Sequence, residues 1–278
     1  MPTIGRRSTL KILRAATPGL YLDAGPLGEI LLPRRYIPAA PADEVDVFIY
    51  RDSEDRLVAT TEAPLAMAGE FACLRVQSLR PSLGAFLDWG LSKDLLLPRR
   101  EQVTFPREGA LVIVYVHVDE KSDRIVASER IDRWLDRTPP PYTPEQAVRI
   151  LVARETPLGY SAIIENAHTG LLYRSDLADP LRIGEQLTGY VRTLRPDGKI
   201  DLALDRKGFA RVRPVADQIL EALEAAGGFL PLSDNSAPAA IREALGVSKK
   251  AFKQAVGILY KKKQIVLADD GIRARSGR

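Results

Sequence analysis

The first three quarters of the chain consist of short alternations of hydrophobic and polar residues, separated by glycine and by acidic turns. The runs LKILRAAT (10–17), ACLRVQSL (72–79) and VRILVARET (148–156) alternate with a period of two, which is typical of strands that bury one face. Segments 45–61, 112–128 and 188–204 are strand-like runs broken by a polar turn, a pattern that predicts hairpins. We therefore expect this part of the chain to be dominated by β-strands.

An internal repeat organises these strands. Residues 19–35 (GLYLDAGPLGEILLPRR) and 84–100 (GAFLDWGLSKDLLLPRR) share nine of 17 positions at a shift of 65. A weaker third copy at 159–175 keeps Gly159, Leu171, Leu172 and Arg174. Each copy lies between an alternating run and a predicted hairpin, so the chain contains three tandem copies of one supersecondary unit.

Each unit has the length of about five short strands, which is the size of a small Greek-key barrel of the OB type. Closing such a sheet into a barrel removes its exposed edges. We predict a mainly β, multidomain protein with three tandem five-stranded OB-type barrels at residues 1–67, 68–137 and 143–208. The segment TPPPYTP (138–144) predicts a stiff connection, because proline restricts the backbone.

The segment SERIDRWLD (128–136) between the second and third units predicts a short helix. Ile131, Trp134 and Leu135 would share one face of this helix. We interpret Trp134 as a packing residue at a domain junction rather than a ligand contact.

The remaining residues, 209–278, have helical rather than alternating patterns. Segments 214–228 and 236–246 predict two helices that end at glycine, with Ser236 as a possible cap of the second. Ser248 can cap a third helix, whose buried stripe comprises Phe252, Val256 and Leu259. The segment QIVLADDGIRA (264–274) predicts two strands around an Asp-Asp-Gly turn. Three helices followed by a hairpin predict a winged-helix (α+β) domain.

The distribution of charge sets the C-terminal domain apart. The chain has 40 basic and 36 acidic residues, a net charge of +4. Residues 209–278 hold 12 basic and 7 acidic residues, whereas residues 1–208 hold 28 and 29. The basic excess therefore lies entirely in the predicted winged helix, a first indication of nucleic-acid contact.

Composition argues against several chemistries. Cys73 has no partner for an intrachain disulfide, and with His117 and His168 it cannot supply the four ligands of a structural zinc site. The chain has no Gly-Lys-Ser/Thr phosphate loop and no apolar stretch of 18 residues. We expect no catalytic residue, no metal, no cofactor, no small-molecule substrate and no membrane partner. The pair Arg6-Arg7 has a superficial likeness to an export signal, but charges interrupt the following segment, so we expect a cytoplasmic protein.

The repeats resemble the RNA-binding module first named in ribosomal protein S-one. The whole chain resembles the conserved virulence factor B (YitL-like) family of bacterial RNA-binding regulators, and GAFLDWGLSKDLLLPRRE (84–101) is the most specific segment. The resemblance implies three RNA-binding modules and a C-terminal winged helix. It places the module's strand aromatic at Tyr21 and Phe86, and at Tyr160 beside the strict position Ser161. It places the module's histidine position at Pro33, Pro98 and Tyr173, and its hairpin pair at Asp52/Arg56, Asp119/Arg124 and Arg195/Lys199.

The candidate site combines flat aromatic side chains with nearby cations, which is the chemistry that binds unpaired nucleotides. Alternation directs Tyr21 and Phe86 outward, with the following leucine facing the core. The pairs Arg34-Arg35 and Arg99-Arg100 recur at matched positions and suggest a phosphate track. Trp89 could serve base stacking or interdomain packing equally well. The predicted RNA-binding set is Tyr21, Arg34, Arg35, Arg56, Phe86, Trp89, Arg99, Arg100, Arg124, Tyr160, Tyr173, Arg174 and Lys199.

Lysines flank the third helix of the tail at both ends and suit contacts to a nucleic-acid backbone. The predicted contacts are Lys249, Lys250, Lys253, Lys261, Lys262 and Lys263. A winged helix can also bind proteins, so the ribosome and duplex nucleic acid are both considered as partners of this domain.

The leading hypothesis is a non-enzymatic protein that binds single-stranded RNA through several weak modules, whose linkage raises the overall affinity. It would act as a post-transcriptional regulator of gene expression. One alternative is a DNA-binding transcription regulator that acts through the winged helix. The other is an RNA-processing enzyme or accessory subunit, whose chemistry would rest on carboxylates alone.

Overall fold

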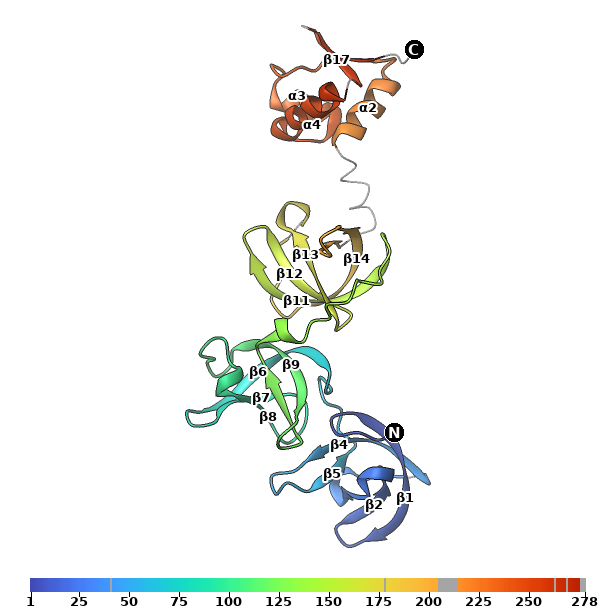
Figure 1. Ribbon diagram of the computed structural model, residues 1–278, viewed down its shortest axis with the longest axis vertical. Coiled ribbons are helices and arrows are strands. Elements are labelled where there is room, and N and C mark those ends of the chain that lie inside the picture. The colour runs from blue at the N-terminus through green and yellow to red at the C-terminus, as the bar shows by residue number, and fades with distance from the viewer. Residues whose placement is uncertain (41, 178, 205–214, 263, 269, 276–278) are drawn as a thin grey trace. The chain divides into compact units, whose positions relative to one another are not determined.

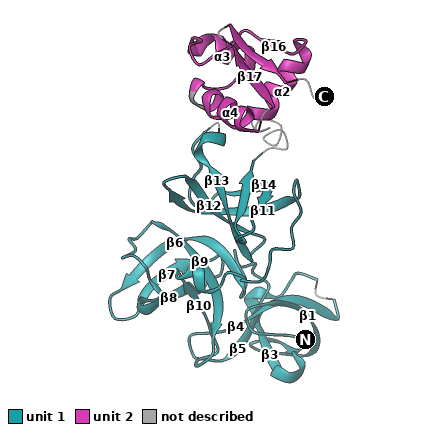
Figure 2. Ribbon diagram, turned by 45° about the horizontal axis from the view of Figure 1, so that its top comes forward, with its two compact units in different colours: residues 1–204 teal, residues 205–278 magenta. Residues whose placement is uncertain are grey.

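The computed structural model describes residues 1–278 except 41, 178, 205–214, 263, 269 and 276–278, and it leaves the side chain of Lys250 undescribed. The chain divides into two compact units, residues 1–204 and 205–278, which Figure 2 shows in different colours. The first unit contains three closed β-barrels, and the second contains helices and a small sheet (Figure 1).

The first barrel closes five strands around a hydrophobic core. Its strands are β1 (Arg7–Ala16), β2 (Gly19–Asp23), β3 (Glu29–Pro33), β4 (Glu44–Arg51) and β5 (Leu57–Thr60). Their order is β1-β2-β3-β5-β4, with the third and fifth strands paired in parallel at Leu31 and Val58. All other neighbouring pairs are antiparallel.

The second and third barrels repeat this topology. The second comprises β6 (Glu70–Arg80), β7 (Gly84–Asp88), β8 (Leu95–Pro98), β9 (Leu111–Asp119) and β10 (Arg124–Ser128). The third comprises β11 (Ala147–Thr156), β12 (Gly159–Ile164), β13 (His168–Tyr173), β14 (Gln186–Leu194) and β15 (Ile200–Ala203). The predicted fold class, three five-stranded barrels followed by a winged helix, is confirmed. The exact domain boundaries remain a prediction.

The repeated glycine lets the second strand of each barrel pass close to the third. A Cβ on Gly84 would lie 2.1 Å from the carbonyl oxygen of Leu97, and the equivalent distances at Gly19 and Gly159 are both 2.0 Å. The third strand then runs directly into a single 3-10 turn: η2 (Arg34–Tyr36), η3 (Arg99–Glu101) and η5 (Arg174–Asp176). The close approach at the repeated glycine therefore places a turn that contains arginine beside the start of the second strand.

Contacts between consecutive barrels are partly aromatic. Phe48 of the first barrel packs edge-to-face on Trp89 of the second, with ring centroids 5.6 Å apart. The second and third barrels share a small apolar cluster that comprises Phe71, Ile131, Leu151, Ala153 and Ile163. The first, second and third barrels thus have hydrophobic surfaces in common as well as cores of their own.

The prediction of a helix over residues 128–136 is wrong. Only Ile131–Arg133 form a 3-10 turn, η4. Ile131 is buried in the cluster between the second and third barrels, and the prolines that follow do not favour helix extension. Trp134 keeps 37% of its surface exposed and stacks on Tyr115, with ring centroids 4.5 Å apart. Trp134 therefore packs on a strand of the second barrel, close to the junction.

The second unit has the elements of a winged helix. They are α2 (Val215–Ala225), β16 (Phe229–Leu230), α3 (Pro238–Leu245), α4 (Lys249–Lys261), β17 (Ile265–Ala268) and β18 (Gly271–Ala274), with sheet order β16-β18-β17. The predicted stripe on α4 is buried, because Phe252, Val256 and Leu259 are each at most 4% exposed. The short strand β16 has no clear signal in the sequence.

The predicted N-terminal cap is present at α4 but not at α3. The Ser248 hydroxyl oxygen accepts a hydrogen bond from the amide of Ala251 at 3.2 Å, as predicted. Ser236 does not cap α3, because Ala237 occupies the cap position. The Ser236 hydroxyl oxygen instead accepts a bond from the amide of Ser233. Among the described helices, none is long and apolar enough to cross a membrane.

Candidate nucleic-acid interface

The outward faces of the first two barrels carry the predicted strand aromatics. Tyr21 and Phe86 are half-buried, whereas the following Leu22 and Leu87 are fully buried. An arginine lies over each ring: Arg14 is 3.8 Å from the centroid of Tyr21, and Arg80 is 5.3 Å from that of Phe86. A flat ring beside a cation is therefore repeated on both faces. Arg14 also pairs with Glu29 at 2.8 Å, whereas Arg80 forms no ion pair with a described residue. Aromatic rings and cations together are the groups that bind unpaired nucleotides.

The equivalent face of the third barrel differs. Tyr160 is 4% exposed and belongs to the core, so its predicted stacking role is wrong. The outward residue at this point of β12 is Ser161, because side chains alternate along a strand and Tyr160 lies one position earlier. Tyr173 is half-buried and donates its hydroxyl hydrogen to Asp201 Oδ1 at 3.2 Å. Arg195 in turn donates to the Tyr173 hydroxyl oxygen.

Trp89 is not available for stacking on a base. It is 2% exposed, packs on Phe48 and donates its indole N–H to the carbonyl of Lys93. Trp89 therefore belongs to the junction between the first and second barrels. This corrects its inclusion among the RNA-binding residues.

Five of the predicted cations are paired with carboxylates. The nitrogen–oxygen distances lie between 2.6 and 3.4 Å in the pairs Arg56–Asp52, Arg100–Asp119, Arg124–Asp55, Arg174–Glu155 and Lys199–Asp197. The hydrogen bond from Arg124 lowers the pKa of the Asp55 carboxyl below its ordinary value. Exposed pairs of this kind contribute little to stability, but they reduce the positive charge that a phosphate would meet.

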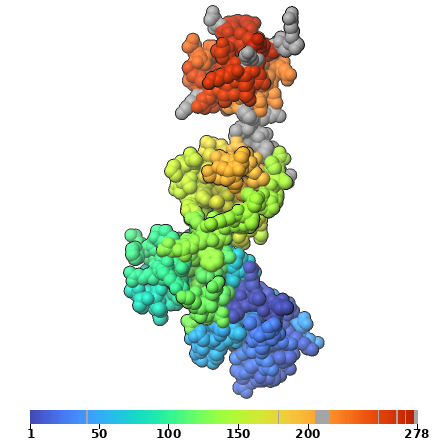
Figure 3. All heavy atoms as spheres, in the orientation of Figure 1, coloured from blue at the N-terminus to red at the C-terminus, as the bar shows by residue number. Residues whose placement is uncertain are grey.

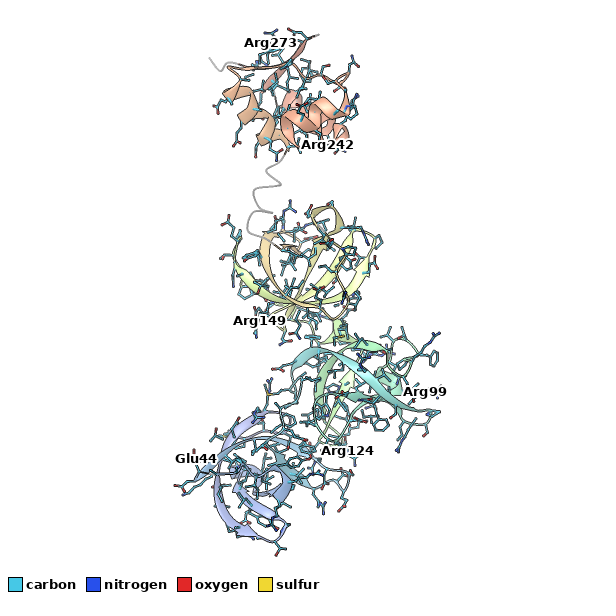
Figure 4. The ribbon with its side chains drawn as sticks, turned by 180° about the vertical axis from the view of Figure 1, so that it is seen from behind. Glu44, Arg99, Arg124, Arg149, Arg242 and Arg273 are labelled. Atoms are coloured by element: carbon cyan, nitrogen blue, oxygen red, sulfur yellow. The ribbon has the colours of Figure 1, made fainter. Side chains whose placement is uncertain are left out.

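Three other predicted cations form no ion pair within the described part of the chain. Arg34, Arg35 and Arg99 are exposed, and each lies in a 3-10 turn that follows a third strand. Arg35 lies over the ring of Tyr36 at 4.6 Å. Figure 4 shows Arg99 on the second barrel, with Arg124 on the side of that barrel nearer the first. These three arginines are the cations best placed to contact phosphate.

Sequence reasoning missed three residues of this surface, Arg14, Arg80 and Phe105. Arg80 is exposed at the end of β6 and forms no ion pair with any described residue. Phe105 is 86% exposed in the loop that precedes β9. Arg80 and Phe105 line a groove of about 240 Å³ together with Gly84 and Arg99. The signal available for Phe105 was TFPRE (104–108), where an aromatic residue stands two positions before an arginine outside any alternating run.

The winged helix places some of its predicted lysines at the surface. Lys253, Lys261 and Lys262 are exposed, and Lys249 is half-buried. Lys253 lies 3.4 Å from Asp234. The side chain of Lys250 and the whole of Lys263 lie outside the described residues.

Clusters of titratable side chains suited to a metal are absent from the described residues. Within the described ranges, no group of three or more histidine, cysteine, aspartate or glutamate side chains could hold a metal ion. The described surface offers aromatic and basic groups rather than a ligand set.

Comparisons with known proteins agree with this geometry. The pattern of the S1 domain matches residues 4–62, and that of the CvfB-like winged helix domain matches residues 217–273. The Bacillus subtilis protein YitL, described as uncharacterized, is 31% identical over 226 residues, which cover 79% of this chain and 76% of the relative. The chain belongs to the conserved virulence factor B (YitL-like) family.

Two further similar proteins have lower sequence identity. Conserved virulence factor B of Staphylococcus haemolyticus is 26% identical over 259 residues, which cover 88% of this chain and 86% of the relative. A crystal structure of a multidomain protein with nucleic acid binding domains from Streptococcus pneumoniae is 26% identical, covers 98% of both chains and has a TM-score of 0.40. The S1 and winged-helix domains that define the family are nucleic-acid-binding modules, which are not of an enzymatic kind.

Proposed function

We propose that this protein binds single-stranded RNA through the outward faces of its first two barrels and that it has no catalytic activity. The observation that carries the proposal is the repeated pair of an outward aromatic ring and an arginine, Tyr21 with Arg14 and Phe86 with Arg80. An aromatic ring can stack on any unpaired base, and an arginine beside it can contact phosphate. Arg80 is unpaired among the described residues and suits that contact, whereas Arg14 already pairs with Glu29 at 2.8 Å.

The role in the cell follows from weak, linked contacts. Each barrel offers a small number of contacts, and covalent linkage makes the second contact effectively intramolecular. We propose that the protein acts in the cytoplasm as a post-transcriptional regulator that occupies transcripts. Binding that depends on stacking and phosphate contacts has little sequence preference of its own.

The aromatic part of the proposal is tested by fluorescence anisotropy with a labelled single-stranded RNA. Phe86→Ala and Tyr21→Ala should each weaken binding by about 1–3 kcal/mol, which is the value of stacking one base. Leu158→Ala is the control, because Leu158 is 62% exposed but lies at the third barrel, where the strict aromatic position is serine. Unchanged affinity in both aromatic variants, with folding intact, refutes the assigned faces.

The electrostatic part has a matched pair of variants. Arg99→Ala should weaken binding and reduce the slope of log K against log salt by about 0.7, the contribution of one phosphate on a single strand. Arg56→Ala should change both less, because Arg56 already pairs with Asp52 and Glu54 at 2.7 and 2.8 Å. Equal effects of the two substitutions would show that pairing does not decide which cation meets phosphate.

A second candidate function rests on the winged helix. The exposed Lys253, Lys261 and Lys262 on or just after α4 favour contact with a nucleic-acid backbone, and duplex DNA is the alternative ligand. Sequence-specific binding of duplex DNA that is lost in a Lys261→Ala, Lys262→Ala variant, and kept in Phe86→Ala, would favour a DNA-binding transcription regulator.

A further inference from the structure

A small pocket lies between the first and second barrels, beside one of the proposed RNA-binding faces. The outward face of the second barrel contributes Phe86, Lys93, Leu96 and Arg124, and the first barrel contributes Tyr50 and Arg51 at the end of β4. The cavity measures about 170 Å³. Figure 3 shows these two barrels, coloured blue and teal to green, in direct contact.

Several contacts hold the first barrel against this face. Arg124 Nε lies 2.7 Å from Asp55 Oδ1, and Arg51 Nη2 lies 3.3 Å from Asp123 Oδ2, so the two hairpin tips are joined in both directions. The Lys93 ammonium donates a hydrogen bond to the carbonyl of Arg51 at 2.8 Å. The pocket walls are thus positioned before any ligand arrives, which reduces the entropy lost on binding.

The chemistry of the pocket suits a flat ring with polar groups at its edge. Phe86 and Leu96 supply apolar surface. The polar groups at the walls come from Arg51, Lys93, Asp94 and Arg124. Burial lowers the pKa of Lys93, and the nearby Arg124 lowers it as well, which indicates that the site is partly desolvated.

The surroundings of the pocket suit the chain on either side of such a ring. Arg80 lies over the ring of Phe86 and lines the neighbouring groove with Arg99 and Phe105. A strand that enters the pocket with one base would therefore pass unpaired cations and an exposed aromatic on leaving it.

We propose that the first barrel completes the RNA site of the second. One unstacked nucleotide of single-stranded RNA enters the pocket, and its base lies against Phe86 with its polar edge toward Arg51. This inference rests on the proposed RNA binding but goes beyond it, because it makes the two barrels a single site rather than two independent modules.

The test uses the full chain and a fluorescein-labelled single-stranded RNA of mixed sequence, about 12 nucleotides long, which spans one barrel face. Arg51→Lys keeps the charge but removes the guanidinium that lines the pocket and contacts Asp123 of the second barrel, and it should weaken binding on the order of tenfold. Arg56→Lys is the control from the same hairpin. Arg56 is exposed and paired with Asp52, so its substitution should weaken binding less than Arg51→Lys does.

A second variant fills the pocket without touching a core. Leu96→Trp places a large side chain at a half-buried outward position of β8, and it should weaken binding at least as much as Phe86→Ala. Leu171→Trp alters the equivalent outward position of β13 in the third barrel and should have no such effect. Thermal unfolding of each variant shows whether the barrels remain folded.

Photocrosslinking gives a direct readout. RNA that contains 4-thiouridine should crosslink to the Tyr50–Arg51 segment of the first barrel as well as to the strand that carries Phe86. Crosslinks confined to the second barrel, or pocket variants that bind like their controls while Phe86→Ala weakens binding, overturn the composite pocket and leave the proposed function intact. Absence of RNA binding by the unmodified chain overturns both.

Discussion

Replacing Gly84 by alanine should strongly destabilise the second barrel. The new methyl carbon would lie 2.1 Å from the Leu97 carbonyl oxygen, which is 0.9 Å less than the 3.0 Å below which such contacts essentially never fall. Gly84 also has φ +143°, and a side chain in that region costs about 1–3 kcal/mol. Because the carbonyl must move, the pairing of Gly84 with Pro98 and the 3.0 Å bond from the Arg99 amide to Leu83 are disturbed as well.

A buried backbone group left without its partner costs about 1–3 kcal/mol, so the total loss should be about 2–6 kcal/mol. Gly109→Ala is the matched control, because Gly109 has φ +79° but nothing lies within 4 Å of its added Cβ. It should cost about 1–2 kcal/mol, from backbone conformation alone. Urea unfolding followed by tryptophan fluorescence measures both, since Trp89 is buried in the second barrel. Equal midpoints for the two variants would refute the close-approach explanation of the repeated glycine.

Three further predictions concern other parts of the chain. The pKa of Asp55 is lowered by its bond to Arg124, so the stability that the pair contributes is present above the ordinary value of 3.8 and is lost as pH falls through the lower folded value. The difference in unfolding midpoint between the native protein and Asp55→Asn should therefore shrink in acid, and a constant difference would contradict this. Burial raises the pKa of the Cys73 thiol, so iodoacetamide should alkylate it more slowly near neutral pH than in the unfolded chain; equal rates would argue against that burial. Phe252→Ala should destabilise the winged helix by about 3–5 kcal/mol, measured from the helical circular dichroism signal during urea unfolding, and a loss near zero would contradict its place in the core.

The architecture could be predicted because the sequence of each barrel shows the alternation of its strands locally, and because this pattern occurs three times along the chain. Leu22 and Leu87 alternate with outward neighbours as a half-buried strand requires, and both are fully buried. Ser248 lies just before an amphipathic run and caps α4 as expected. These predictions needed only residues that are close in the sequence, because each of the predicted features depends on hydrogen bonding and burial within one helix or strand.

The site was less predictable because it depends on contacts between distant residues. Trp89 is buried because Phe48 of another barrel packs on it, and the residues around Trp89 in the sequence do not predict that contact. Arg124 bonds to Asp55, 69 positions away, rather than to Asp119 of its own hairpin. Tyr160 was misassigned by a single position, and in a strand one position reverses the face of a side chain.

The carboxylates paired with the hairpin cations have a consequence for how tightly the protein can hold its ligand. Asp55, Asp119 and Asp197 occupy the same guanidinium or ammonium groups that an RNA phosphate would approach. A phosphate that binds at one of these positions must displace the carboxylate. The net free energy gained is then only the difference between the cation–phosphate and the cation–carboxylate interactions. If the protein binds RNA as proposed, the net gain from each of these contacts is therefore smaller than that from an unpaired cation such as Arg99.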